Sequence, residues 1–249
     1  MDIVYVIGGG KSSHGDIEMR MSLRSICKHG IGIGKVIVAG TPPDWLSKEA
    51  VQVYVSDCFG YKHNNILRCL DNVVAKGLVK GDFLYSSDDH FYLRPVDFAS
   101  YPVFRKDGDF KSRVARDDPH FRYHKSLSDT RKLLIRHGLP HENYSQHCNT
   151  HFNAETFDIF HNLIEESYEL TFGTEPTSLL MNCWQTMDNP PRVVDRTDAK
   201  LCRPYATAKE IKERLGDRHC FSIGDGIFEG RGIVEFFKEE FPDKCVFEM

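Results

Sequence analysis

The chain has 249 residues, of which 41% are hydrophobic and 27% are charged, and its formal net charge is −4. This composition suits a globular protein with one large core, and the negative charge excludes a general attraction to nucleic acid, so any such binding would need a local basic patch. No apolar run approaches the roughly 20 residues that span a bilayer, and the N-terminal residues lack the basic start of a signal peptide, which predicts a cytoplasmic protein that does not enter the membrane.

The first hundred residues alternate short β-like runs with helical patterns. This alternation predicts an α/β fold with a mostly parallel sheet flanked by helices, whose ligands bind beyond the carboxyl ends of the strands. The expected strands cover residues 3–8, 35–40, 51–56 and 83–87, and the expected helices cover residues 16–29 and 64–76.

A glycine-rich loop follows the first expected strand, with Gly8, Gly9 and Gly10 preceding Lys11. It is not a P-loop, because that motif needs a glycine five positions before Gly10, where Tyr5 stands, and it also lacks the Gly-x-Gly-x-x-Gly spacing. Two interpretations stay open: a loop whose backbone approaches a ligand, with Lys11 as a phosphate contact, or a plain flexible turn.

The most informative stretch is residues 82–95, where a buried-strand pattern ends in Asp88, Asp89 and His90. Two adjacent carboxylates are costly to desolvate unless a positive charge faces them. A divalent cation bound to a phosphorylated ligand would supply that charge, since Mg²⁺ and Mn²⁺ prefer oxygen ligands. The alternative is a solvated turn at a strand end.

Residues 104–136 carry ten Lys or Arg against five Asp or Glu, interleaved with aromatic residues. This mixture is typical of contacts to phosphates and stacked bases, although a solvated segment of mixed charge is an equally open interpretation. Further on, helices are expected at residues 154–170, 177–186, 206–215 and 232–240, with a strand at residues 220–223. We expect one domain over residues 1–249, with an α/β half (1–100) and a more helical half (101–249).

The eight cysteines include no Cys-x-x-Cys pair, which argues against a structural zinc site or a redox dithiol. Without a secretory signal they are expected to be reduced thiols in the core.

Several segments of the chain can be compared with a known group of proteins. They are Asp16–Ile26, Pro43–Leu46, Lys62 with Asn65 and Ile66, Ser87–Phe91, His147 with Phe152–Glu155, and Phe241–Glu248. In the same order along the chain, these segments resemble glycosyltransferases of the nucleotide-diphosphosugar (GT-A) type, particularly bacteriophage glycosyltransferases and the related Stealth proteins. Within them Ser87 replaces the usual Asn, Asn149 replaces Pro and Ala154 replaces Lys.

The resemblance implies a GT-A-like (Rossmann-like) fold and a nucleotide-sugar donor whose diphosphate is bridged to the protein by Mn²⁺ or Mg²⁺. It implies Asp89 as the first metal ligand and His147 as a further one, with Asp88 acting in catalysis toward the donor ribose or a metal-bound water. His90 is a weaker candidate, because it would project to the opposite face from Asp89 if the strand continued.

Other residues are candidates for holding the donor or activating the acceptor. Arg20 and Arg24 share one helix face and could fork onto diphosphate oxygens, or be surface charges. The resemblance adds Lys62 and Asn65 as contacts to phosphate and to base or sugar, beside Gly8 and Lys11. An inverting reaction needs a base, for which Asp225 and Glu155 are candidates, although a Gly-Asp-Gly sequence is often only a turn.

Three hypotheses follow. The first is a metal-dependent glycosyltransferase of bacteriophage type, working in the host cytoplasm, whose acceptor is a hydroxymethylated pyrimidine in DNA. The second is a Stealth-like phosphotransferase that moves sugar-1-phosphate onto a polysaccharide. The third is a non-catalytic module that binds carbohydrate or nucleic acid.

Overall fold

The computed structural model describes residues 1–8, 14–106, 110, 114, 115, 117, 118, 120–188, 192–195 and 199–249, with only the backbone described for 192–195 and 225. Its centre is a five-stranded sheet in the order β4-β3-β1-β5-β9. The first four of these strands are parallel and β9 is antiparallel to β5, so the prediction of a mostly parallel α/β sheet is confirmed. The strands are β1 (Asp2–Ile7), β3 (Val36–Gly40), β4 (Val51–Tyr54), β5 (Asp82–Ser86) and β9 (Thr150–Asn153).

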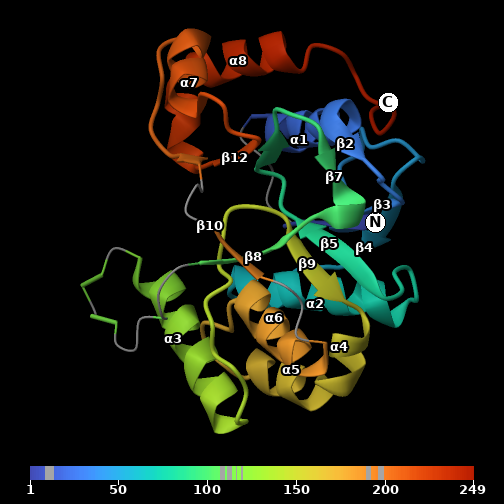
Figure 1. Ribbon diagram of the computed structural model, residues 1–249, viewed down its shortest axis with the longest axis vertical. Coiled ribbons are helices and arrows are strands. Elements are labelled where there is room, and N and C mark those ends of the chain that lie inside the picture. The colour runs from blue at the N-terminus through green and yellow to red at the C-terminus, as the bar shows by residue number, and fades with distance from the viewer. Residues whose placement is uncertain are drawn as a thin grey trace.

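Helices cover both faces of this sheet (Figure 1). Helix α1 (Ile17–His29) packs its buried side, including Leu23 and Ile26, on one face with Tyr5 and Val38. Helix α2 (Lys62–Ala75) and helix α6 (Pro176–Met187) pack on the other face. The near-continuous apolar sequence of β3 follows from this arrangement, because a strand covered on both faces has no side left for water.

A second layer is built from the C-terminal part of the chain. Strand β6 (His90–Tyr92), which follows the acidic pair directly, is antiparallel to β12 (Cys220–Ile223), which pairs in turn with β11 (Lys200–Leu201). Phe91 stacks on Phe221 with ring centroids 4.8 Å apart. These rings anchor a third apolar cluster with helices α7 (Ala208–Leu215) and α8 (Gly232–Glu240). In Figure 1 these two helices lie at the top, and α2 to α6 lie below the strands.

The structure differs from the sequence prediction in two segments. Residues 104–136 are not simply a solvated segment, because they include part of strand β8 (Val103–Lys106) and all of helix α3 (Phe121–Arg136), which buries Leu127, Leu133 and Leu134. The helix expected at residues 154–170 is two helices, since the chain leaves helical geometry at Phe160 (φ −104°, ψ 23°). None of the described helices is long and apolar enough to cross a membrane.

The remaining elements are short or lie at the margins of the sheet. They are β2 (Gly30–Ile31), β7 (Val96–Asp97), η1 (Phe98–Ser100), β8 (Val103–Lys106), α3 (Phe121–Arg136), α4 (Glu155–Ile159), α5 (His161–Tyr168), β10 (Arg192–Asp195) and η2 (Asp225–Glu229).

All eight cysteines are free thiols. The expectation that they belong to the core is right only in part. Three are buried (Cys69, Cys148 and Cys183), two are half-buried, and three are exposed.

Candidate active site

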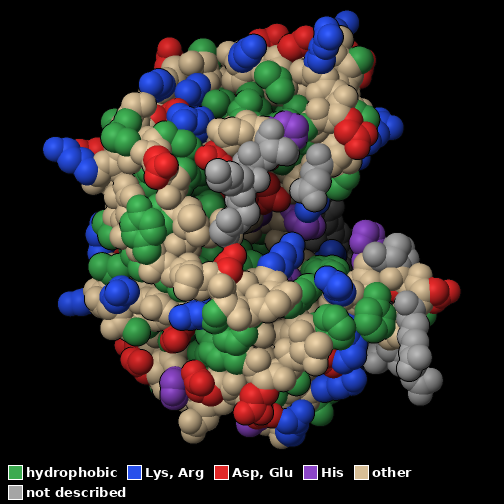
Figure 2. Space-filling model, turned by 180° about the vertical axis from the view of Figure 1, so that it is seen from behind, with side chains coloured by type: hydrophobic (Ala, Val, Ile, Leu, Met, Phe, Trp, Pro, Cys, Tyr) green, Lys and Arg blue, Asp and Glu red, His purple; other side chains and the backbone are tan. Residues whose placement is uncertain are grey.

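A cavity of about 700 Å³ opens at the carboxyl ends of the parallel strands. Gly8 follows β1 and residues 87–89 follow β5, and both line it. Between β1 and β5 the strand order changes direction, since β3 and β4 continue on one side and β5 on the other. Such switch points are where open α/β sheets bind their ligands. Figure 2 shows a hollow across the middle of the molecule that contains acidic, basic and histidine side chains.

The cavity brings together residues from distant parts of the chain. Because β9 is antiparallel to β5, the segment before it, residues 145–148, reaches the same edge of the sheet. Of the residues that the sequence analysis assigned to the site, the cavity is lined by Gly8, Lys62, Asn65, Asp88, Asp89 and His147. It is also lined by Glu18, Ser87, His90, Gln146 and Lys200, which sequence patterns either do not single out or give only as weaker candidates.

Asp89 is held as a carboxylate by its neighbours. Its Oδ1 accepts a hydrogen bond of 2.5 Å from Ser87 Oγ and lies 3.6 Å from His90 Nε2. Burial alone would raise the pKa of Asp89, but the charge on His90, the Ser87 hydrogen bond and Lys200 together hold that pKa below its ordinary value. The charge on Asp89 is therefore balanced by the protein itself.

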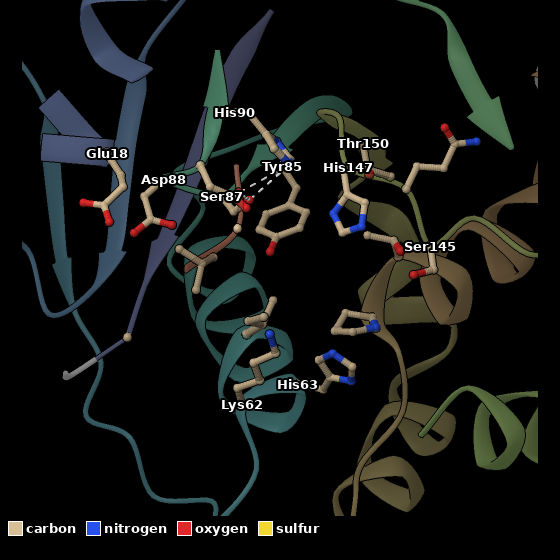
Figure 3. Close-up of a pocket in the computed structure, with 18 of the residues that line it drawn as sticks. Glu18, Lys62, His63, Tyr85, Ser87, Asp88, His90, Ser145, His147 and Thr150 are labelled. Atoms are coloured by element: carbon tan, nitrogen blue, oxygen red, sulfur yellow. Dashed lines mark hydrogen bonds and ion pairs between the residues drawn. The ribbon is translucent and has the colours of Figure 1, made fainter. Parts of the chain in front are cut away.

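Asp88 has no such balance. Burial, which is the largest cause, and the neighbouring carboxylates of Asp89 and Glu18 together raise its pKa to about 7. Figure 3 shows the carboxylates of Asp88 and Glu18 turned toward the same side of the cavity. Because Asp88 lies beside the carboxylates of Asp89 and Glu18, a bound cation would stabilise its ionised form.

The carboxylates of Asp88 and Asp89 suit a divalent cation that is held jointly by the protein and by a phosphorylated ligand. Among the described residues, no three His, Cys, Asp or Glu side chains are grouped so that they could hold a metal ion by themselves. Mg²⁺ in phosphate-binding sites is commonly held by one or two carboxylates, with phosphate oxygens and water completing its coordination. Asp88 and Asp89 fit that role, provided that the ligand brings phosphates.

His147 reaches the cavity, but its ring is paired with a lysine. Its Nδ1 lies 3.4 Å from Nζ of Lys200, which also lines the cavity. Burial, which is the largest cause, and the charge of Lys200 together lower the pKa of His147 to about 4, against the smaller opposite effect of Asp89. His147 is therefore neutral near pH 7, and the predicted role of a third metal ligand is not supported by any three-ligand group among the described residues.

His90 lies in the site, whereas the strand alternation predicted that it would point away. The reason is that β5 ends at Ser86 and the chain turns before β6 begins at His90, so the alternation is interrupted. Its Nε2 lies 3.2 Å from Ser87 Oγ and its Nδ1 lies 3.2 Å from Asn149 Oδ1. His90 thereby orients the loop that carries the acidic pair.

The N-terminus of α2 forms another wall of the cavity (Figure 3). Lys62 is exposed there and can meet an anionic ligand. The side chain of Asn65 is hydrogen-bonded to the backbone of the protein. Its Oδ1 accepts from the backbone N–H groups of Cys58 (3.1 Å) and Phe59 (3.0 Å), and its Nδ2 donates to the Phe59 carbonyl (3.0 Å). Asn65 therefore fixes the loop after β4, which differs from the predicted contact to base or sugar.

Gln146 lines the cavity and carries a buried amide nitrogen. Its Nε2 is buried and has no hydrogen-bond partner within the described parts of the chain. A buried donor without a partner costs about 1–3 kcal/mol, which an acceptor oxygen on a ligand would recover. Sequence patterns give no sign of such a residue, because only the fold leaves it without a partner.

Arg20 and Arg24 do not line the cavity, so the structure does not support their predicted contact with a diphosphate. Arg24 makes a bidentate ion pair with the buried Glu248 (2.6 and 2.9 Å), and Arg20 Nη1 lies 3.1 Å from the same carboxylate. The Arg20 guanidinium also stacks 3.9 Å above the ring of Trp45. We call this group of Arg20, Arg24, Trp45 and Glu248 the tail clasp.

Three predicted site residues remain, namely Glu155, Asp225 and Lys11. Glu155 is exposed at the start of α4 and does not line the cavity, so its candidacy as a base is not supported. Asp225 begins η2 between Gly224 and Gly226, which both line the cavity, but its side chain lies outside the described part of the structure. Lys11 also lies outside the described residues.

Comparison with known proteins gave no relatives: no protein-family model matches the chain, and no curated protein matches it.

Proposed function

We propose that the protein is a glycosyltransferase that moves a sugar from a nucleoside-diphosphate sugar to an acceptor hydroxyl. One observation carries this proposal. The neighbouring carboxylates of Asp88 and Asp89 end β5 inside a cavity of about 700 Å³ at the switch point of a parallel sheet, with Lys62 and Lys200 on its walls. Carboxylates and ammonium groups around one space suit a ligand with phosphates and an associated cation.

The reaction sets the demands on the site. The bond between the sugar C1 and the β-phosphate oxygen breaks, and its electron pair leaves with the nucleoside diphosphate. The acceptor oxygen bonds to C1 and its proton is released. Negative charge therefore grows on the β-phosphate, where fixed positive charges lower the barrier.

The described residues divide these tasks. Asp88 and Asp89 would hold Mg²⁺ or Mn²⁺, which supplies positive charge to the leaving diphosphate. Lys62 adds positive charge at the start of α2, and Lys200 adds it beside His147. Ser87 and His90 hold the Asp89 carboxylate in one position. Gln146 offers its unpartnered Nε2 to an oxygen of the donor or acceptor.

The test is a transfer assay with a panel of nucleotide sugars and Mn²⁺, with hydroxymethylated duplex DNA, plain DNA and a glycan as acceptors. We expect release of nucleoside diphosphate and a product heavier by one sugar. Asp88→Asn and Asp89→Asn should each lower the rate by about 100-fold or more, the size expected for losing electrostatic stabilisation of a leaving group.

The matched control is Asp44→Asn, which removes an exposed carboxylate outside the cavity. Full activity of both cavity variants would refute the assigned roles. A product that retains phosphate, with release of nucleoside monophosphate, would identify a sugar-phosphate transferase instead.

A further inference from the structure

A second cavity, of about 640 Å³, adjoins the first and shares His147 and Cys148 with it. The rest of its wall comes from the end of α7, the loop before β12 and Phe104 of β8. Its volume lies within the range of cavities that take small molecules or single building blocks of a polymer. Because His147 belongs to both cavities, a ligand in the second one lies next to a ligand in the first.

The charged side chains on this wall are mostly cationic. Arg214 is in the last turn of α7, Arg218 follows it, and the one carboxylate among the described lining residues is Asp217. Asp217 Oδ1 is 2.8 Å from Arg94 Nη2, so this carboxylate already has a cationic neighbour of its own.

Positive charge is also present at His147, which both cavities share. Lys200 lies 3.4 Å from His147, and the charges of both Lys200 and Lys106 act to lower the pKa of His147. A ligand that passes His147 from the first cavity into the second therefore meets the positive charge of Lys200 at this point.

The apolar part of the wall favours a ligand with a flat or hydrophobic portion. Phe104 is half-buried, which leaves part of its ring accessible, and Leu215 and Phe221 form the buried floor beside it. Arginines bind phosphate in a fork geometry, whereas a neutral sugar offers them no charge.

We propose that the second cavity binds the acceptor through a phosphate group held by Arg214 and Arg218. This inference rests on the proposed function, because it places the acceptor on the far side of His147 from the nucleotide sugar. The acceptor is then a phosphate ester, either a monoester such as a sugar phosphate or a diester such as a nucleic-acid strand.

Calorimetric titration tests the proposal without turnover. The probes are glucose 6-phosphate as the monoester, a single-stranded oligonucleotide of about six nucleotides as the diester, and glucose as the neutral comparison. We expect at least one phosphate probe to bind the wild-type protein and glucose not to bind. The Arg214→Gln, Arg218→Gln double variant should bind that probe about tenfold more weakly or worse.

Two further variants keep the result interpretable. Lys209→Gln removes an exposed cation from the same helix but not from the cavity wall, and it should leave binding unchanged. Arg214→Glu alters only an exposed residue and should weaken binding even if the double variant folds poorly.

Equal affinity of the wild-type and both arginine variants, or no binding of either phosphate probe, would overturn the inference. The binding of one probe over the other identifies the source of the phosphate. Arginine-dependent binding without transfer from any nucleotide sugar would leave this subsite standing and refute the proposed function. Sugar transfer without arginine-dependent binding of a phosphate probe would support the proposed function and refute the phosphate subsite.

Discussion

The two neighbouring carboxylates differ because their surroundings differ. Asp89 receives a hydrogen bond and lies near three basic groups, whereas Asp88 lies near Glu18 and Asp89. The raised pKa of Asp88 stabilises the fold only while the group is protonated. That stabilisation is complete below the ordinary pKa of an aspartate and is lost as the pH rises through about 7.

Asp88→Asn should therefore raise the melting temperature by several degrees at pH 8 and by clearly less at pH 5. Added Mg²⁺ together with a nucleoside diphosphate should raise the melting temperature of the wild-type protein at pH 8 more than that of the variant. Thermal melts of both proteins at the two pH values, with Asp44→Asn as the control, measure this. An equal change at pH 5 and pH 8 would contradict the assignment.

His63 gives the opposite pH dependence. Burial lowers its pKa to about 3, and its Nδ1 lies 2.9 Å from Ser126 Oγ. The folded protein therefore binds fewer protons than the unfolded chain, so stability is complete above about pH 6.5 and is lost as the pH falls below it.

We expect His63→Gln to flatten this dependence between pH 6.5 and pH 4, by up to about 1.4 kcal/mol per pH unit. Urea unfolding across that range measures the slope. His147, whose pKa is also lowered, leaves a residual slope in the same direction. An unchanged slope in the variant would show that His63 is not the group responsible.

At the scale of elements, β1, β3, β4 and β5 were predicted correctly, and the continuous apolar runs of β1, β3 and β5 suit parallel strands covered on both faces. Helix α3 was not predicted, since its apolar residues are diluted by basic ones and its buried side depends on contacts such as those with α6. Asp88 and Asp89 could be predicted as site residues because they are neighbours in the sequence. Gln146 and Lys200 could not, because only the folded chain brings them to the cavity.

The tail clasp explains why Arg20 and Arg24 lie away from the cavity. Their spacing correctly predicted a shared helix face, but a helical pattern cannot say what covers that face. Here it is the segment that contains Glu248, whose side chain is fully buried. Three of the segments that carry the family resemblance meet in this one cluster: α1, the loop with Trp45, and the C-terminal segment.

Arg24→Ala should destabilise the fold by roughly 3–5 kcal/mol, because it leaves a buried carboxylate with less compensation. Ligand affinity at the first cavity should stay unchanged, since the clasp does not line it. Denaturant unfolding measures the first effect and nucleotide titration the second, with the exposed Lys238→Ala as the control. A loss of nucleotide affinity in a folded Arg24→Ala protein would restore the original diphosphate role.

At the scale of the whole molecule, the two tryptophans report on the two apolar clusters that pack against the main sheet. Trp45 belongs to the tail clasp, and Trp184 of α6 is buried with its ring 5.5 Å from that of His151 in β9. If residues 1–249 form one cooperative unit, as the shared strands suggest, both tryptophans should report the same unfolding midpoint. Fluorescence of the Trp45→Phe and Trp184→Phe variants in urea tests this, with each midpoint compared with circular dichroism of the same variant. Separate midpoints would mean two independently folding layers.

Three residues, Ser87 to Asp89, join β5 of the main sheet to β6 of the C-terminal layer. A ligand that binds both Asp88 in this connection and Lys200 on β11 would link the two layers of the molecule. Occupation of the cavity should then slow amide hydrogen exchange in β12, although β12 lies only at the edge of the binding space.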